Sequence, residues 1–134
     1  MYADPERVMQ LVLRHMDGPL VRGVRDCCTQ PCAVFGDLFG VNPLGPVSYR
    51  TKLEAFRFIR ERGGPDACAS GIATAAGLVP CAPAPGVIGR IKRPYSELDL
   101  TLAICVDGSL WAAKTVDGFE VKQSAIACWG LPWV

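Results

Sequence analysis

Several features that would assign a protein to a broad class are missing from this 134-residue sequence. Neither charge is in excess, because 14 lysines and arginines face 13 aspartates and glutamates, and this balance predicts no nucleic-acid partner and no binding to a membrane surface. No apolar run is long enough to span a bilayer, so we expect no membrane insertion. The first six residues lack the basic start and apolar stretch of a secretion signal, and we therefore expect assembly in the cytoplasm.

Histidine is also scarce, since His15 is the only one in the chain. Cysteine, in contrast, is abundant, with seven residues. The odd number and the missing export signal predict reduced thiols and no disulfide framework. Four of the cysteines have apolar neighbours and are expected to act as small core residues: Cys68, Cys81, Cys105 and Cys128.

The first half of the chain, residues 4–78, has the apolar spacing of helices. Thr29 and Thr51 are suited to cap the second and third of these helices. The third helix is expected to bury the stripe formed by Leu53, Phe56 and Ile59. The predicted helices cover residues 5–16, 29–39, 52–62 and 65–77.

A proline-rich connector, residues 79–86, leads to a second half, residues 87–134, with the pattern of short strands. Asp107-Gly108 and Asp117-Gly118 are typical of tight hairpins and predict an antiparallel meander. Helices followed by strands predict a single α+β domain over residues 1–134, with a sheet of four or five strands. The predicted strands cover residues 87–92, 100–106, 110–115, 119–123 and 127–134.

The stretch from Arg25 to Pro43 contains a candidate reactive cysteine and the helix that would position it. It begins with a loop that ends in Asp26-Cys27, continues as an apolar helix and stops at Gly40-Val41-Asn42-Pro43. A helix N-terminus carries partial positive charge, which favours a thiolate over a thiol. Thiol hydrolases present their nucleophile in this way, and Cys27 is therefore a candidate nucleophile.

Short motifs follow one another in a distinctive order along nearly the whole chain. They are Asp26-Cys27, Gly40-Val41-Asn42-Pro43, Tyr49-Arg50-Thr51, Ala55-Phe56-Arg57-Phe58, Gly63-Gly64, Gly86-Val87-Ile88, Leu102-Ala103-Ile104-Cys105-Val106 and a terminal Trp129 with Trp133-Val134. Their order and spacing resemble a branch of phage-encoded, NlpC-like proteins. These proteins have the papain-like fold of small bacterial cell-wall cysteine peptidases.

The resemblance implies a place in the virion. Phage members of this group are usually tail proteins at the tail tip or hub, in the baseplate region. The implied partners are other tail proteins, such as hub, distal tail or tail-tip proteins, and the implied locations are the phage tail and, during assembly, the host cytoplasm. Two tryptophans among the last six residues, Trp129 and Trp133, are expected to pack against a neighbouring subunit.

The resemblance also implies which residues would carry a hydrolase reaction. It assigns the nucleophile to Cys27, with Asp26 and Cys28 as neighbours. The family's general base is a histidine at the start of a sheet strand, and the matching position here is Thr101, which cannot act as a base near neutral pH. The Gly-Asp that usually opens the family's sheet reads Gly86-Val87. We therefore expect a structural tail protein on a degenerate peptidase scaffold.

Other interpretations stay open at this point. His15, or a base from a neighbouring chain, would make Cys27 the nucleophile of an active cell-wall cysteine peptidase or amidase. Cys27, Cys28 and Cys32 with a further cysteine would bind zinc, but their spacing lacks the usual Cys-x-x-Cys pair. A disulfide between Cys28 and Cys32, or a more distant one, would require release from the cell. Buried free thiols are the plainest reading, with no metal and no cofactor.

Overall fold

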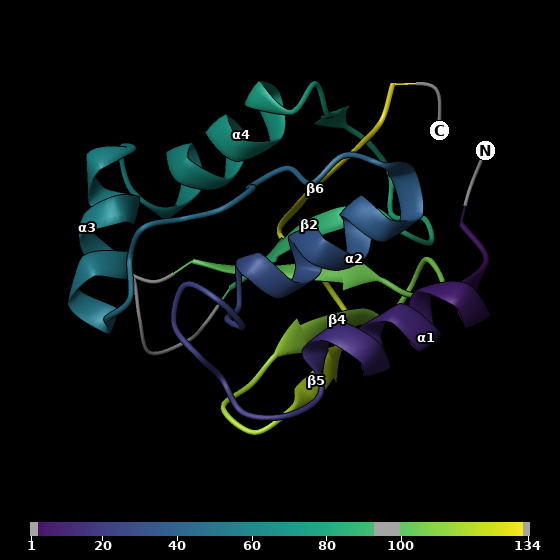
Figure 1. Cartoon of the computed structure of the whole chain (residues 1–134). Coiled ribbons are helices and arrows are strands. Elements are labelled where there is room, and N and C mark those ends of the chain that lie inside the picture. The colour runs from purple at the N-terminus through teal and green to yellow at the C-terminus, as the bar shows by residue number, and fades with distance from the viewer. Residues whose placement is uncertain (1–2, 93–99, 133–134) are drawn as a thin grey trace.

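The computed structural model describes residues 3–92 and 100–132, and within these residues four helices precede a six-stranded antiparallel sheet. The α+β class predicted from the sequence is confirmed (Figure 1). The helices are α1 (Pro5–Met16), α2 (Thr29–Phe39), α3 (Lys52–Glu61) and α4 (Pro65–Ala75). A membrane-spanning helix needs about 20 apolar residues, and no helix in this described part is long and apolar enough.

Local side-chain chemistry sets the helix ends. The Asp4 carboxylate accepts a hydrogen bond of 3.0 Å from the backbone N–H of Glu6 at the start of α1. The Thr51 hydroxyl accepts one of 3.1 Å from the N–H of Glu54, which confirms Thr51 as the cap of α3. Gly40 ends α2 in the left-handed conformation, with φ of 79°.

The sheet has the strand order β1-β6-β2-β3-β4-β5. Its strands are β1 (Val79–Pro80), β2 (Ile88–Ile91), β3 (Thr101–Cys105), β4 (Trp111–Lys114), β5 (Phe119–Lys122) and β6 (Ala127–Gly130). The predicted meander is present as β3-β4-β5, but the sheet is larger than predicted. The extra strand, β1, lies in the predicted connector, where Pro80 is tolerated because β1 is an edge strand.

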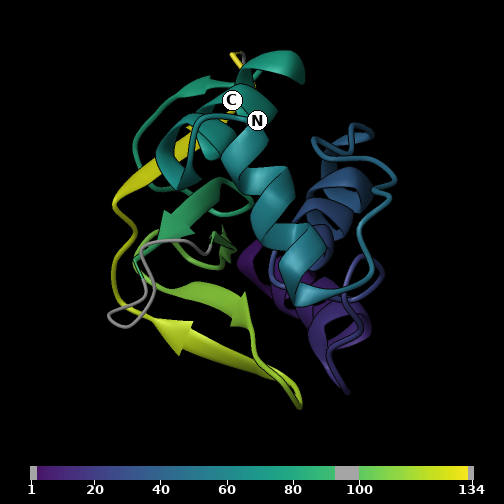
Figure 2. The ribbon, with the colours of Figure 1, turned by 90° about the vertical axis from the view of Figure 1, so that its left-hand side faces the viewer.

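The central strands of the sheet, β3 and β4, are buried along their whole length. Helices α1 and α2 lie against one face, as Figure 2 shows. Leu102 and Ile104 of β3 point toward these helices, whereas Ala103 and Cys105 point to the opposite face. On that opposite face the Trp111 ring packs so closely over Gly89 that a Cβ there would lie 2.4 Å from a ring carbon. Strand β3 is therefore buried on both sides.

A buried lysine ties the far end of the sheet to the loop that follows α1. Lys114 of β4 is 1% exposed, and its ammonium group donates to the carbonyl oxygens of Gly18 (2.6 Å), Thr115 (2.9 Å) and Gly118 (2.8 Å). Burial lowers the pKa of Lys114, because it disfavours the charged form. These bonds hold the loop that leads to Cys27.

Two predictions about burial are wrong. Ile59 on α3 is buried as predicted, but Leu53 is 68% exposed and Phe56 is only partly buried, because the other residue that α3 buries is Ala55. Cys68 and Cys105 are buried as predicted, but two other cysteines are only half-buried because they lie near the edge of the sheet: Cys81 and Cys128.

Candidate functional site

Cys27 lies in the capped first turn before α2 and faces the start of β3. Its backbone oxygen accepts a hydrogen bond of 3.1 Å from the N–H of Leu102. Its Sγ lies 3.1 Å from the carbonyl oxygen of Leu100, to which the thiol donates. The Cys28 thiol donates to the same oxygen over 3.3 Å. A backbone carbonyl oxygen accepts a hydrogen bond from the thiol, but it is too weak a base to remove the proton and generate the nucleophilic thiolate.

Asp26 is the residue that caps this turn. Its carboxylate accepts backbone N–H bonds from Gly23 (2.7 Å), Cys28 (2.9 Å) and Thr29 (2.8 Å), and the side chain is buried, with 1% exposure. The Thr29 hydroxyl in turn accepts the N–H of Asp26 over 2.9 Å, which completes a reciprocal capping box. Thr29 was predicted to be the cap of α2, and that prediction is wrong, because Thr29 is the first residue of the helix and Cys28, which makes no side-chain cap bond, occupies the N-cap position. The Asp26 carboxylate accepts the N–H groups of both residues from the turn before the helix.

The loop before Asp26 requires a glycine. Gly23 has φ of 80°, and a Cβ on it would lie 1.9 Å from the backbone oxygen of Tyr49. The close approach lets the N–H of Gly23 reach Asp26 and presses the loop against the chain around Tyr49. Gln30 supports the same loop from α2, because its side-chain amide donates to the oxygen of Val24 over 2.8 Å.

The neighbouring thiols are held in the protonated form. The pKa of Cys28 is raised, first by its hydrogen bond with Cys27 and then by burial. Burial raises the pKa of Cys32 to about 12. Metal-binding cysteines act as thiolates, and among the described residues no three histidine, cysteine, aspartate or glutamate side chains come together as a metal site. The structure therefore does not assemble the zinc site considered from the sequence.

A very small cavity lies beside Cys27. Asp26, Cys27 and Cys28 line one side of it, and Tyr49 and Leu100 are among the residues of the other. Its volume is about 10 Å³, which is close to the minimum for one water molecule. Cys27 itself is 8% exposed. The site as it stands cannot admit a peptide.

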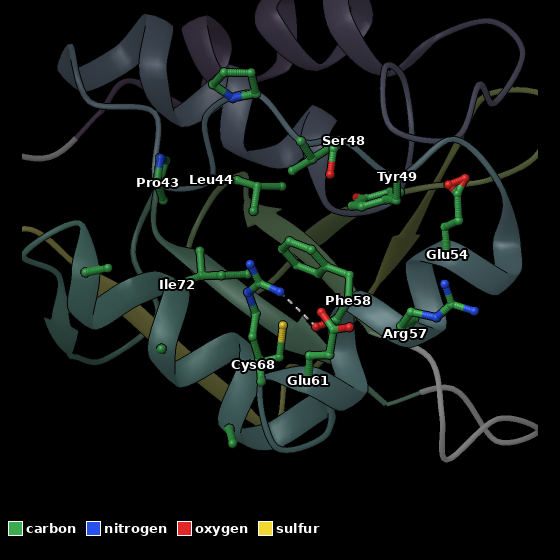
Figure 3. Close-up of a pocket in the computed structure, with 16 residues that line it drawn as sticks. Pro43, Leu44, Ser48, Tyr49, Glu54, Arg57, Phe58, Glu61, Cys68 and Ile72 are labelled. Atoms are coloured by element: carbon green, nitrogen blue, oxygen red, sulfur yellow. Dashed lines mark hydrogen bonds between the residues drawn. The ribbon is translucent and has the colours of Figure 1, made fainter.

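A much larger hollow lies just outside this cavity. The groove between α3, α4 and the chain from Pro43 to Tyr49 has a volume of about 810 Å³ (Figure 3). Tyr49 and Phe58 line both the groove and the cavity, and their ring centroids lie 5.2 Å apart. The Arg62 guanidinium lies 3.5 Å from the Phe58 ring centroid on the groove side. This aromatic wall, Tyr49 and Phe58, separates the open groove from the thiol.

The structure does not bring His15 to Cys27. The Nε2 atom of His15 lies 2.7 Å from the Oδ2 atom of Asp37, so the ring joins α1 to α2. Both side chains are partly exposed to solvent. His15 is not among the residues that line the cavity around Cys27 in the described part of the chain.

Thr101 also lies apart from Cys27. Side chains alternate along β3, which places Thr101 on the same face as Ala103 and Cys105, away from the helices. The residue that meets the sulfur is Leu100, through its backbone oxygen.

Trp129, one of the two predicted partner-interface residues, lies largely inside the domain. Trp129 is 8% exposed and belongs to the core beneath the helices, because β6 inserts between β1 and β2 and is not an edge strand. The second tryptophan of the predicted interface, Trp133, lies outside the described residues. No signal in the sequence predicted the wall formed by Tyr49 and Phe58. The capping box was also missed, but the Asp-x-x-Thr spacing of Asp26 and Thr29 could have predicted it.

The fold and the site define a small α+β domain with a capped, enclosed thiol at the junction of helix and sheet. Residues 2–131 match the family described as a domain of unknown function, DUF6950, and the chain belongs to that family. No curated protein and no solved structure gives a significant match to the chain.

Proposed function

We propose that this protein is a structural component of a bacteriophage tail tip or hub, built on a degenerate NlpC-like, papain-like scaffold. The proposal combines the motif resemblance with one observation about the site. Among the residues that the structure describes, the hydrogen-bond acceptor of the Cys27 thiol is the backbone oxygen of Leu100, at 3.1 Å, where a working thiol hydrolase needs a base.

Three further features support a structural role. Asp26 uses its carboxylate on three backbone N–H groups and thereby serves the helix end. The cavity at Cys27 has room for about one water molecule. Tyr49 and Phe58 stand between the thiol and the groove where an extended substrate would fit. On this proposal, the scaffold contributes its surface to the tail and makes contacts with hub, distal tail or tail-tip proteins.

Two experiments test the proposal. Mass spectrometry of purified virions from a phage that encodes the chain should find it in the particle, at a constant ratio to the tail proteins. Its absence from virions, with abundance only in the infected cell, would contradict the structural role.

The second experiment tests the rival activity. Purified protein and the Cys27→Ala variant are incubated with peptidoglycan, and released stem peptides are measured. We expect the two proteins to give the same background. Release that depends on Cys27 would establish a cell-wall peptidase or amidase and would overturn the degenerate-scaffold part of the proposal.

A further inference from the structure

Two half-buried cysteines face each other across the edge of the sheet. Strands β1 and β6 are antiparallel, with Val79 opposite Gly130 and Pro80 opposite Trp129. The next pair in this register is Cys81 opposite Cys128, and the N–H of Cys81 donates to the oxygen of Cys128 over 3.2 Å. The two cysteines are therefore direct cross-strand partners, although 46 residues separate them in the sequence.

Their side chains lie on the same face of the sheet. Both pack against the cluster that contains Trp111 and Cys105. The Cys128 thiol donates to the backbone oxygen of Cys81 over 3.0 Å, and the Cys81 sulfur lies above Gly130, where no side chain intervenes. Hydrogen-bonded antiparallel partners have Cα atoms about 5.5 Å apart, which is within the usual range for a disulfide.

The pair also differs from the other cysteines in access. Cys81 and Cys128 are partly exposed, whereas the remaining five are buried: Cys27, Cys28, Cys32, Cys68 and Cys105. A small oxidant can therefore reach this pair without unfolding the protein.

We propose that Cys81 and Cys128 form a reversible disulfide by exchange with a low-molecular-weight disulfide of the oxidised-glutathione class. A thiolate of the pair attacks one sulfur of the oxidant, forms a mixed disulfide and releases the first small thiol. The second cysteine then attacks the protein sulfur of that mixed disulfide and releases the second small thiol. Two protein thiols are oxidised, one small disulfide is reduced, and the two thiol protons leave on the two small thiols.

The contacts between the two thiols give the order of attack. Burial raises the pKa of both thiols; the hydrogen bond between them offsets part of that rise at Cys81 and adds to it at Cys128, whose pKa reaches about 11. Cys81 is therefore the first nucleophile, and Cys128 resolves the mixed disulfide. The product would fix the two-residue edge strand β1 to β6, and it does not depend on the function proposed above.

The test uses the full chain, purified under reductant and then exposed to oxidised glutathione. Remaining thiols are alkylated after unfolding, and the linked peptides are identified by mass spectrometry. We expect the loss of two of the seven thiols, one dominant cross-link between Cys81 and Cys128, and complete reversal by dithiothreitol.

Variants separate this pair from its neighbours. Cys81→Ser and Cys128→Ser should each abolish the cross-link, and Cys128→Ser should retain glutathione on Cys81. Cys105→Ala, in the same cluster, should leave the cross-link intact. Seven free thiols after oxidation of the folded wild-type protein, or a dominant link elsewhere, would overturn the inference. Because the wild-type peptide map is decisive by itself, a variant that fails to fold does not weaken the test.

Discussion

Two pairs of thiols on opposite faces of one sheet have opposite surroundings. Cys27 and Cys28 lie beneath the helices, share the Leu100 oxygen as acceptor and are enclosed by the aromatic wall. Cys81 and Cys128 lie at the β1 edge and are half-exposed. We therefore expect the reactivity of each thiol to follow from what covers it. A position at a helix N-terminus, by itself, does not make Cys27 accessible.

The largest expected effect comes from opening the enclosed pair. Tyr49→Ala removes a buried ring from the wall and should cost about 3–5 kcal/mol of unfolding free energy. Under native conditions it should also raise the rate at which iodoacetamide labels Cys27, because the cavity would join the groove.

Phe35→Ala is the matched control for this change. Phe35 is fully buried in α2 and does not line the cavity, so its loss should cost a similar free energy without exposing Cys27. Equal labelling of Cys27 in both variants would show that general destabilisation, and not the wall, controls access.

Asp26→Ala removes the cap of the turn that carries Cys27. Three backbone N–H groups would lose their acceptor, and we expect a loss of about 3 kcal/mol in urea denaturation. Asp37→Ala removes a partly exposed carboxylate paired with His15 and should cost less than about 1 kcal/mol. Similar losses for the two variants would contradict the role of Asp26 as a buried cap.

Gly89→Ala tests the face that carries Cys81 and Cys128. The new methyl group would collide with the Trp111 ring, and we expect a loss of about 1–3 kcal/mol. Gly71→Ala, on α4 with open space around it, should gain up to about 1 kcal/mol from helix propensity. Thermal or urea denaturation compares the stabilities of the two variants. An unchanged stability of Gly89→Ala would mean that the Trp111 ring does not pack closely against Gly89.

The smallest expected effect is that of pH on the rate at which the Cys81–Cys128 disulfide forms. The pKa of each thiol in the Cys81–Cys128 pair is raised above its ordinary value, mainly by burial. The reactive thiolate is therefore a minor species at neutral pH, and its population rises about tenfold for each pH unit. The initial rate with oxidised glutathione should increase accordingly from about pH 7 to about pH 8. An initial rate that does not change with pH would contradict this prediction, because it would show that the attacking thiol of the pair is already a thiolate at neutral pH.

Local rules predicted much of the fold. The Thr51 cap, the end of α2 at Gly40 and the meander through β5 all depend on residues close together in sequence. The order of β1, β6 and β2 could not be read in the same way, because β6 returns from the end of the chain to pair between two earlier strands. This pairing also turned Trp129 from an expected surface residue into a core residue.

The candidate site was predicted only in part. Asp26 and Cys27 were identified by the helix start that follows them, and the structure places them together. The contact of Cys27 with the Leu100 backbone oxygen could not be predicted, because it depends on how the turn before α2 packs against the start of β3. The wall depends on Tyr49 and Phe58, which come from a loop and from α3 and meet only through tertiary packing.

Residue-resolved alkylation of the native protein tests the central claim most directly. Iodoacetamide is added at neutral pH for increasing times, and labelling of each cysteine is measured by mass spectrometry after quenching. The account predicts that Cys81 is labelled well before Cys27, and that Cys27 reacts only as fast as the protein opens. Cys27 as the fastest-labelled thiol of the folded chain would contradict the account, because it would show an activated nucleophile within reach of solvent.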